Sequence, residues 1–195
     1  MRIGVLSVQG AVREHLNILS QLGIDGRKVK KVEQLSGLSG LILPGGESTT
    51  ISLLSRGRLL TKVGELAKKE FPIFGTCAGM ILLADEIEGQ EDAYVQAIDI
   101  TVARNASGRQ VDSFETMLCV NGVADDFPAV FIRAPYITRV GNGVTVLAKH
   151  RGAAVMARQG NVLVASFHPE LTNDMRIHRY FVEMAKEYEE KEAVL

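Results

Sequence analysis

The chain has 195 residues, of which 46% are hydrophobic and 23% are charged, and its net charge is −1. This composition predicts one globular domain over residues 1–195, and the lack of a basic block argues against nucleic acid as a partner. Two cysteines without metal-ligand spacing, no signal-peptide pattern and no apolar run of about 18 residues predict a cytoplasmic protein without a metal site or membrane span.

The first half of the chain alternates strand-like and helix-like segments. Apolar runs predict strands over residues 2–8, 27–32, 40–43 and 72–74, of which the second is basic and near a sheet edge. Helical patterns cover residues 11–22, 47–55, 59–70 and 80–84. The alternation predicts an α/β fold of three layers, with a mostly parallel central sheet and helices on both faces.

The second half of the chain is richer in strands. Turn signals separate six strand-like segments, which are residues 98–103, 113–120, 129–133, 143–149, 153–159 and 162–167. The last two hairpins predict an antiparallel extension of the sheet, after which the chain returns to the core at residues 162–167. A final helix is expected over residues 172–190.

Residues 75–79 (Gly-Thr-Cys-Ala-Gly) place a cysteine between two glycines, after an apolar strand and before a helix-like run. This is the pattern of a nucleophile elbow with Cys77 in the place of serine. Glycines flank such a nucleophile because its backbone is strained and neighbouring chain approaches closely. A thiol at a helix N-terminus is also favoured as the thiolate. A buried structural cysteine is the alternative, which this segment alone leaves equally open.

A candidate base for this thiol is His168, which follows the apolar strand over residues 162–167. His168 and Cys77 are therefore both expected at carboxyl ends of strands, where open α/β sheets bind ligands. Pro169 favours extended backbone at His168, and residues two apart in an extended segment point to the same side. Glu170 can then accept a hydrogen bond from one imidazole nitrogen while the other faces Cys77. The alternative is a plain strand-to-helix connection.

The remaining histidines and the second cysteine are given no chemical role. His15 and His178 lie in helical patterns and His150 lies beside a hairpin turn, so all three are expected at surface or capping positions. Cys119 falls in an alternating strand pattern and is expected to serve packing.

Residues 43–48 (Leu-Pro-Gly-Gly-Glu-Ser) form a third cluster, which also follows a strand and opens a helix. Its glycines allow backbone N–H groups to turn toward a ligand, which suits an oxyanion hole or a carboxylate site. A phosphate-binding loop is the weaker alternative, because neither of the usual phosphate-loop patterns is present.

Together, residues 44–48, 75–79 and 168–170 resemble the class I, or triad, glutamine amidotransferases. Longer motifs narrow the resemblance to the family of glutaminase subunits of pyridoxal 5′-phosphate synthase, and these are residues 9–15, 45–50, 108–114, 131–135 and 166–171. The resemblance covers nearly the whole chain and implies the flavodoxin-like architecture of that class.

The resemblance implies that glutamine is hydrolysed to glutamate and ammonia through a thioester, without a cofactor. Cys77 would be the nucleophile, His168 the group that takes and delivers the proton, and Glu170 the residue that orients His168. Backbone N–H groups of Gly46 and Ala78 would hold the oxyanion. The family's contacts to glutamine correspond to Gly46, Glu47, Ser48, Arg104, Ile132 and Arg133. A cation such as Arg104 or Arg133 suits the carboxylate of a free amino acid.

The resemblance also implies a partner, which is the synthase subunit with a (β/α)₈ barrel that receives the ammonia within a hetero-oligomer. The synthase would contact Gln9 and Gly10 and help to set the oxyanion hole. The sequence departs from the family pattern at residues 106–107 and 91–97, both near Arg104, so the shape of the glutamine pocket is less constrained.

Two alternatives to this function stay open. One keeps the chemistry but changes the partner, as in the glutaminase of histidine biosynthesis, although that enzyme would lack the longer motifs. The other is a non-catalytic binding module in which the cysteine elbow serves as a redox sensor or a scaffold. The presence of Cys77, His168 and Glu170 together argues against a scaffold, which needs no such set.

Overall fold

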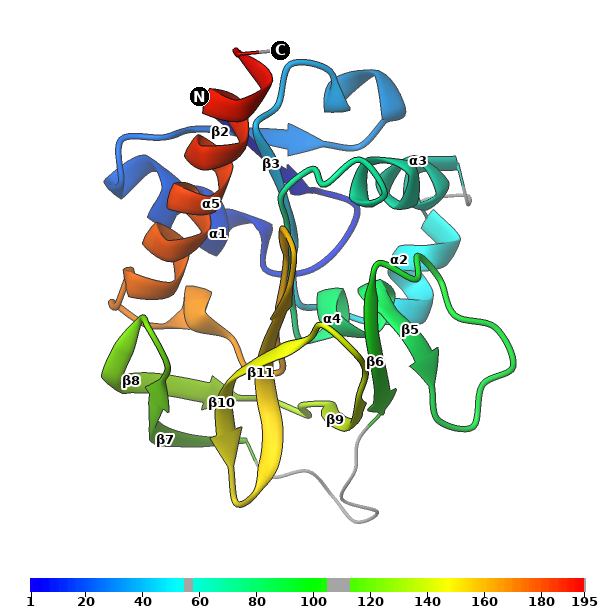
Figure 1. Ribbon diagram of the computed structural model, residues 1–195, viewed down its shortest axis with the longest axis vertical. Coiled ribbons are helices and arrows are strands. Elements are labelled where there is room, and N and C mark those ends of the chain that lie inside the picture. The colour runs from blue at the N-terminus through cyan, green and yellow to red at the C-terminus, as the bar shows by residue number, and fades with distance from the viewer. Residues whose placement is uncertain (55–57, 105–112, 195) are drawn as a thin grey trace.

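The computed structural model describes residues 1–54, 58–104 and 113–194 (Figure 1). Its helices are α1 (Val12–Gln21), α2 (Ser48–Leu54), α3 (Arg58–Ala67), α4 (Ala78–Leu83) and α5 (Arg176–Glu192), with the 3₁₀ helices η1 (Val32–Leu35) and η2 (Pro169–Leu171). Its strands are β1 (Arg2–Leu6), β2 (Asp25–Val29), β3 (Gly40–Leu43), β4 (Ile73–Thr76), β5 (Ala84–Ile87), β6 (Ile98–Ala103), β7 (Phe114–Val120), β8 (Ala124–Phe131), β9 (Tyr136–Val140), β10 (Thr145–His150), β11 (Ala153–Gln159) and β12 (Val162–Ala165).

One large sheet contains all of these strands except β7 and β8. Its order is β2, β1, β3, β4, β12, β11, β9, β6, β5, with β10 paired to β11. The neighbouring strands β2, β1, β3, β4 and β12 are parallel to one another, and β5 is parallel to β6. Antiparallel pairing is confined to β9, β10 and β11 with their neighbours. The expected mostly parallel sheet, its antiparallel extension and the edge position of the second strand are confirmed.

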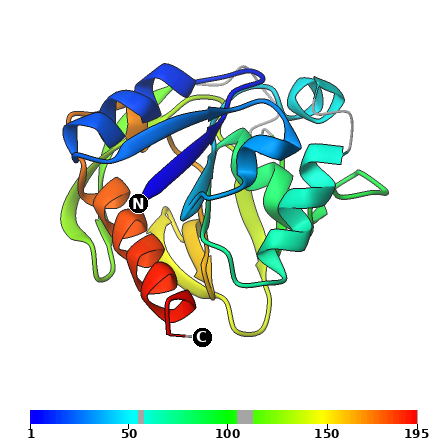
Figure 2. The ribbon, with the colours of Figure 1, turned by 90° about the horizontal axis from the view of Figure 1, so that it is seen from above.

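Helices cover both faces of this sheet, with α1 and α5 on one side and α2 and α3 on the other (Figure 2). The side chains of strand β3 illustrate this arrangement. Leu41 and Leu43 join the core under α2, α3 and α4, whereas Ile42 joins the core under α1 and α5. Because side chains alternate between the two faces of a strand, a strand covered on both faces must be apolar throughout. The predicted three-layer α/β fold is confirmed.

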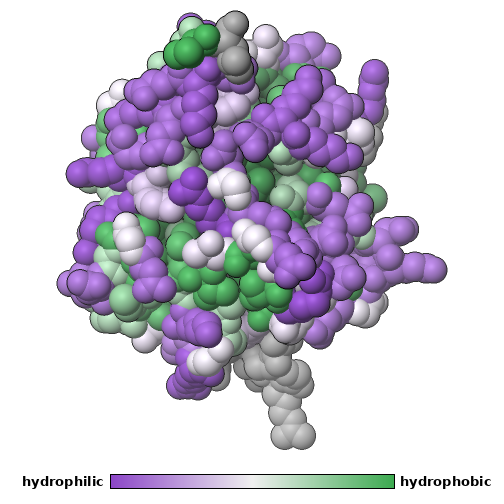
Figure 3. Space-filling model, in the orientation of Figure 1, coloured by the Kyte–Doolittle hydropathy of each residue, from purple (hydrophilic) through white to green (hydrophobic). Residues whose placement is uncertain are grey.

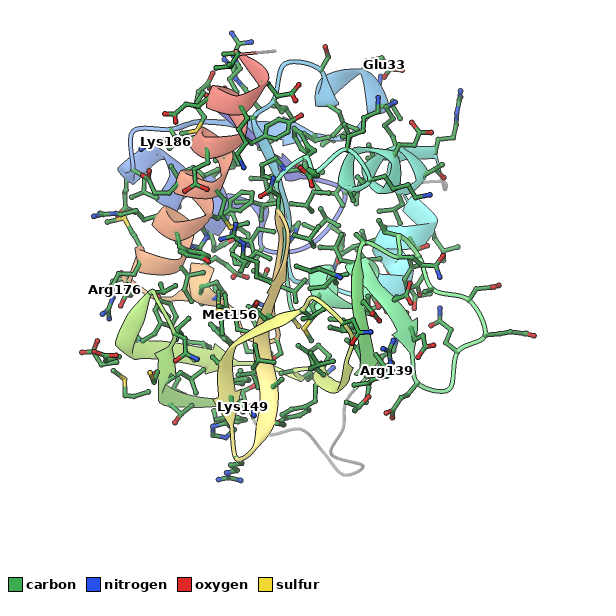
Figure 4. All side chains as sticks on the ribbon, in the orientation of Figure 1. Glu33, Arg139, Lys149, Met156, Arg176 and Lys186 are labelled. Carbon is green, nitrogen blue, oxygen red and sulfur yellow. The ribbon has the colours of Figure 1, made fainter. Side chains whose placement is uncertain are left out.

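Strands β7 and β8 form a separate two-stranded antiparallel sheet. Phe131 at the end of β8 packs against Phe167, which follows β12, with ring centroids 5.5 Å apart. At the start of α5, Arg176 donates a hydrogen bond of 2.8 Å to Asp126 of β8 (Figure 4). These contacts hold the hairpin beside the segment that leads from β12 to α5.

The parallel strands β3, β4 and β12 end together. Leu43 is paired with Gly75, and Thr76 is paired with Ala165. The three segments that follow these strands therefore leave the sheet from the same edge, which brings together residues far apart in the sequence.

Several details differ from the predictions. The helix expected to reach residue 84 ends at Leu83, and the chain continues directly into β5, which was not predicted. Strand β9 was also not predicted, and β8 covers Ala124–Phe131 instead of residues 129–133. Residues 108–112 of one family motif, and the departure at residues 106–107, lie outside the described residues.

Polar side chains cover most of the face seen in Figure 3, and apolar side chains gather in its lower half, over β10 and β11. Within the described residues, we find no helix with both the length and the apolar character needed to cross a membrane.

Candidate active site

Cys77 occupies a strained turn between β4 and α4. Its backbone angles are φ 49° and ψ −103°, in a region that costs a residue with a Cβ about 1–3 kcal/mol. The turn is held by a hydrogen bond of 2.8 Å from the Cys77 N–H to the carbonyl of Ala165, the last residue of β12. The residue is 7% exposed, and its Sγ lies 3.9 Å from the carbonyl oxygen of Ile132. This is the geometry of the predicted elbow.

The two glycines of the elbow permit a close approach of three chain segments. A Cβ on Gly79 would lie 2.0 Å from the carbonyl oxygen of Leu43 in β3. A Cβ on Gly75 would lie 2.6 Å from the backbone of Gly79. Real Cβ contacts are much longer, so the sharp turn from β4 into α4 requires glycine at both positions.

His168 and Glu170 form a buried pair beside the cysteine. The Nδ1 atom of His168 lies 2.7 Å from Oε1 of Glu170, whose side chain is entirely buried. The backbone N–H of His168 donates to the carbonyl of Val130 in β8 at 2.8 Å, which fixes the segment after β12. The two side chains meet as predicted, but the extended His-Pro-Glu segment was a wrong prediction, because Pro169–Leu171 form the 3₁₀ helix η2 and His168 precedes its first residue.

The electrostatics of His168 favour its charged form. Burial by itself lowers the pKa of this imidazole, but hydrogen bonds to Cys77 and Glu170, and the negative charges of both partners, raise the pKa to about 10. The structure therefore couples the thiol, the imidazole and the carboxylate electrically as well as in space.

Residues 44–48 lie directly against this group. The hypothetical Cβ of Gly45 would meet Cε1 of His168 at 2.3 Å, and the N–H of Gly45 donates to Oγ1 of Thr76 at 3.1 Å. The carbonyl of Gly45 accepts a hydrogen bond from the N–H of Ala11 at 3.1 Å. Because C=O and N–H point in opposite directions in a trans peptide, the N–H of Gly46 points away from Ala11.

The neighbouring residues of this loop are fixed by Gln9 and by capping. The Glu47 N–H donates to Oε1 of Gln9 at 2.8 Å, and a Cβ on Gly46 would lie 3.2 Å from the Cα of Gly10. The Glu47 carboxylate accepts from the N–H and hydroxyl of Thr50, and these bonds lower the pKa of Glu47. Ser48 is buried at the start of α2. Gln9 and Gly10 thus touch the loop that touches His168.

Arg104 is anchored beside the same helix. Its Nη1 lies 3.4 Å from Oγ1 of Thr49 in α2, and its Nη2 donates to the hydroxyl of Tyr94 at 2.6 Å. Ile132 is 37% exposed, and Arg133, also exposed, has a φ of 45°. The structure brings Ile132 to Cys77 and Arg104 to the first turn of α2.

Two histidines expected at surface or capping positions are buried, so this part of the prediction is wrong. His15 in α1 and His178 in α5 are both 0% exposed, and His15 Nδ1 lies 2.9 Å from His178 Nε2. His15 Nε2 lies 3.6 Å from Oε2 of Glu170. Their signal in the sequence is helical spacing, because His15 is four residues before Leu19 and His178 is three before Phe181.

The expectations for His150 and Cys119 have different outcomes. His150 is half-buried at the end of β10, and its ring contacts those of Phe114 and Phe131. Cys119 is exposed on β7, so the expectation that it serves packing is wrong. In the described residues, no group of three or more histidine, cysteine, aspartate or glutamate side chains has the arrangement of a metal site.

We expect the free energy of unfolding to be largest near pH 6.5, because the fold lowers the pKa of His15 and His178 and raises the pKa of His168. Burial lowers the pKa of His178 to about 3, and burial with nearby His178 and His168 lowers the pKa of His15. Unfolding below pH 6.5 therefore takes up protons, and His178 alone loses on the order of 2 kcal/mol of stability by about pH 5. The pKa of His168 is raised to about 10, so its contribution is complete below pH 6.5 and is lost as the pH rises toward 10.

Urea unfolding followed by circular dichroism between pH 5 and pH 9 measures this dependence, since the chain has no tryptophan for fluorescence. Replacement of His178 by leucine should flatten the acidic limb. Stability that rises steadily from pH 6.5 to pH 9 contradicts the assignment of His168.

The model of the SNO glutamine amidotransferase family matches residues 5–187 of this chain. The chain belongs to this family. The resemblance drawn from the sequence motifs is thereby confirmed. A relative from Brevibacillus brevis, named pyridoxal 5′-phosphate synthase subunit PdxT, is 55% identical over 96% of this chain and 99% of its own length. A relative of the same name from Bacillus cytotoxicus is 52% identical over the whole of both chains.

Solved structures agree with the fold. A crystal structure of a glutamine amidotransferase superimposes with a TM-score of 0.90 at 49% identity, over 95% of this chain and 100% of that one. A putative GMP synthase protein from Thermoplasma acidophilum superimposes with a TM-score of 0.74 at 20% identity, over 99% and 98% of the two chains. At that identity the second likeness concerns the fold alone.

Proposed function

We propose that the chain is the glutaminase subunit of a pyridoxal 5′-phosphate synthase, one glutaminase domain over residues 1–195 that hydrolyses L-glutamine to L-glutamate and ammonia. The observation that carries the chemistry is the group formed by the strained Cys77, the imidazole of His168 and the buried carboxylate of Glu170. The names of relatives that match over their full length support the assignment to pyridoxal 5′-phosphate synthase.

In the first half of the reaction, the Cys77 thiolate attacks the carbon of the glutamine side-chain amide. A C–S bond forms, and the carbonyl oxygen becomes an oxyanion. The C–N bond then breaks, and His168 in its charged form gives a proton to the leaving nitrogen, which departs as ammonia. The raised pKa of His168 supports this step because the imidazole is protonated at neutral pH.

In the second half, water hydrolyses the thioester. Once Cys77 is acylated it carries no negative charge, so one cause of the raised pKa of His168 is removed. His168 can then take the proton of the attacking water. The C–S bond breaks, glutamate leaves, and the thiolate is restored beside the imidazolium. Glu170 holds the Nδ1 side of the ring throughout.

The oxyanion is assigned to the backbone N–H groups of Gly46 and Ala78. Neither N–H has a hydrogen-bond acceptor in the described part of the chain, and both belong to segments that contact Cys77 or His168. N–H groups without a protein partner are suited to a developing negative charge.

Glutamine would be bound by backbone and side chains around this centre. The residues assigned to this role are Gly46, Glu47, Ser48, Arg104, Ile132 and Arg133. The guanidinium of Arg104 or Arg133 would pair with the substrate carboxylate.

The ammonia would pass to a synthase partner with a (β/α)₈ barrel in a hetero-oligomer, without a cofactor in this chain. Gln9 and Gly10 are the proposed contact, and they touch the loop that bears the Gly46 N–H. A partner that binds Gln9 would therefore act directly on the loop that forms part of the oxyanion hole. Activity of the chain alone is expected to be poor.

Ammonia release from glutamine, measured with and without a purified cognate synthase, tests this function. A rise on addition of the synthase is expected. Full activity without any partner would contradict the dependence on a synthase, and no ammonia under either condition would favour the alternative of a non-catalytic cysteine-elbow module.

A further inference from the structure

A chain of buried polar groups extends from the proposed catalytic group into the core. It starts at Glu170, whose Oε1 holds His168, and continues from Oε2 to His15 and then to His178. The members come from three elements, since Glu170 lies in η2, His15 in α1 and His178 in α5. Histidines buried in a core without a function are costly, because each polar ring must leave water.

Both histidines are neutral at physiological pH. Burial lowers the pKa of His178, and burial, followed by the repulsion that a protonated His15 would meet from His178 and His168, lowers the pKa of His15. A neutral imidazole has one N–H donor and one acceptor nitrogen. The hydrogen bond of 2.9 Å between His15 Nδ1 and His178 Nε2 therefore allows two arrangements of the protons.

In the first arrangement, His178 donates through Nε2 to Nδ1 of His15. The proton of His15 is then on Nε2, which faces Oγ1 of Thr76 at 3.3 Å and Oε2 of Glu170 at 3.6 Å. The other nitrogen of His178, Nδ1, is then an acceptor, and it has no partner among the described residues.

In the second arrangement, His15 donates to His178 through Nδ1. The hydroxyl of Thr76 can then donate to His15 Nε2, but a lone pair of that nitrogen faces the carboxylate oxygen Oε2 of Glu170. His178 would also carry its proton on Nδ1, a buried donor without a described partner. Buried N–H groups without a partner are rarer in proteins than acceptors without one, so the first arrangement is favoured.

The first arrangement also places an N–H donor opposite the unpaired carboxylate oxygen of Glu170. Its Oε2 is buried and has no hydrogen-bond partner among the described residues, and the Nε2 of His15 lies 3.6 Å from it. A carboxylate with one oxygen bonded to His168 and the other attracted to an N–H dipole 3.6 Å away is restrained in its rotation. The plane of the carboxylate in turn sets the plane of the His168 ring.

We propose that His15 is a positioning residue, whose Nε2–H, held in place by His178, fixes the carboxylate of Glu170 and through it the imidazole of His168. This inference rests on the proposed glutaminase function. It adds to that function a fourth and a fifth member of the catalytic network, which act through Glu170 and touch no substrate.

Two amide substitutions of His15 separate this role from a structural one. Glutamine places an N–H₂ donor where Nε2 was, whereas asparagine places it where Nδ1 was. We expect His15→Asn to lower kcat about 10- to 100-fold with KM within about twofold, the usual size of an effect on groups that orient a site. His15→Gln should retain most of the activity. Ile18→Val, a buried apolar change on the same helix, is the matched control.

The pH dependence of Cys77 alkylation by iodoacetamide is a second measurement that needs no turnover. It is made in a Cys119→Ala background, because the exposed Cys119 would also react. The groups that face His15 are His178, Glu170 and the more distant His168, so loss of the Nε2–H removes a dipole directed at Glu170 and changes the electrostatic field felt by His168. The alkylation profile should shift in His15→Asn and remain in place in His15→Gln and Ile18→Val.

The outcomes are distinguishable from failure of the proposed function. Absence of ammonia from the wild type with its synthase overturns the function itself. An active wild type with equal kcat values and equal alkylation profiles in His15→Asn and His15→Gln overturns the positioning role alone. If either His15 variant does not fold, His178→Gln and His178→Asn apply the same test one step further from Glu170, with the same order of activity expected.

Discussion

Cys77→Ala is expected to abolish ammonia release from glutamine, with a fall in kcat of about 10⁴-fold or more in the presence of the synthase. Without the thiol no thioester can form, and no other side chain described near His168 offers a nucleophile of comparable strength. Cys77→Ser should be nearly as inactive, since a hydroxyl gives up its proton far less readily than a thiol. The assay is ammonia release coupled to glutamate formation, at saturating synthase.

Cys119→Ala is the matched control, because it removes the other cysteine of the chain. Cys119 is exposed on β7 and belongs to the hairpin outside the main sheet. Its variant should keep the wild-type kcat and KM. Ammonia release by Cys77→Ala at the wild-type rate would exclude covalent catalysis by Cys77 and remove the basis for the proposed function.

The layered architecture could be predicted because its signals are local. The apolar strand β3 and the elbow between β4 and α4 each show their structure within a few residues. Strand β5 lacks such a signal, since it follows α4 without a turn residue between them. Strand β9 has exposed residues over most of its length and gains its order from pairing with β6 and β11. Pairing of that kind depends on the assembled sheet.

In the candidate site, too, the residues within local motifs could be predicted, whereas the residues placed by packing could not. Cys77, His168 and Glu170 could be placed together because two motifs sit at the ends of strands, and parallel strands end at one edge. The sequence predicts surface or capping positions for His15 and His178, because an isolated histidine in a helix usually lies there. Their burial follows from the packing of α1 and α5 on one face of the sheet, which composition does not reveal.

Gly45→Ala is the second prediction with a large effect. The added Cβ would lie 2.3 Å from Cε1 and 2.8 Å from Nδ1 of His168, so the imidazole must move. The ring cannot move without loss of the 2.7 Å contact between Nδ1 and Glu170. Gly45 is not among the described residues with a positive φ, so alanine fits its backbone and the effect falls on the ring. We expect kcat to fall about 10²- to 10⁴-fold, the range that general acid–base catalysis contributes.

Overpacking of this size also costs about 1–3 kcal/mol of stability, so thermal unfolding should be followed beside the ammonia assay. Gly64→Ala in α3 is the control, since its Cβ would meet the backbone oxygen of Val95 at 3.3 Å, which a shift of a few tenths of an ångström relieves, and it touches no member of the site. Helix interiors favour alanine over glycine by about 0.5–1 kcal/mol, so this variant should stay folded and fully active. If Gly45→Ala keeps a kcat within about threefold of wild type while still folded, the ring of His168 does not need the position that the structure gives it, and its role in proton transfer must be assigned differently.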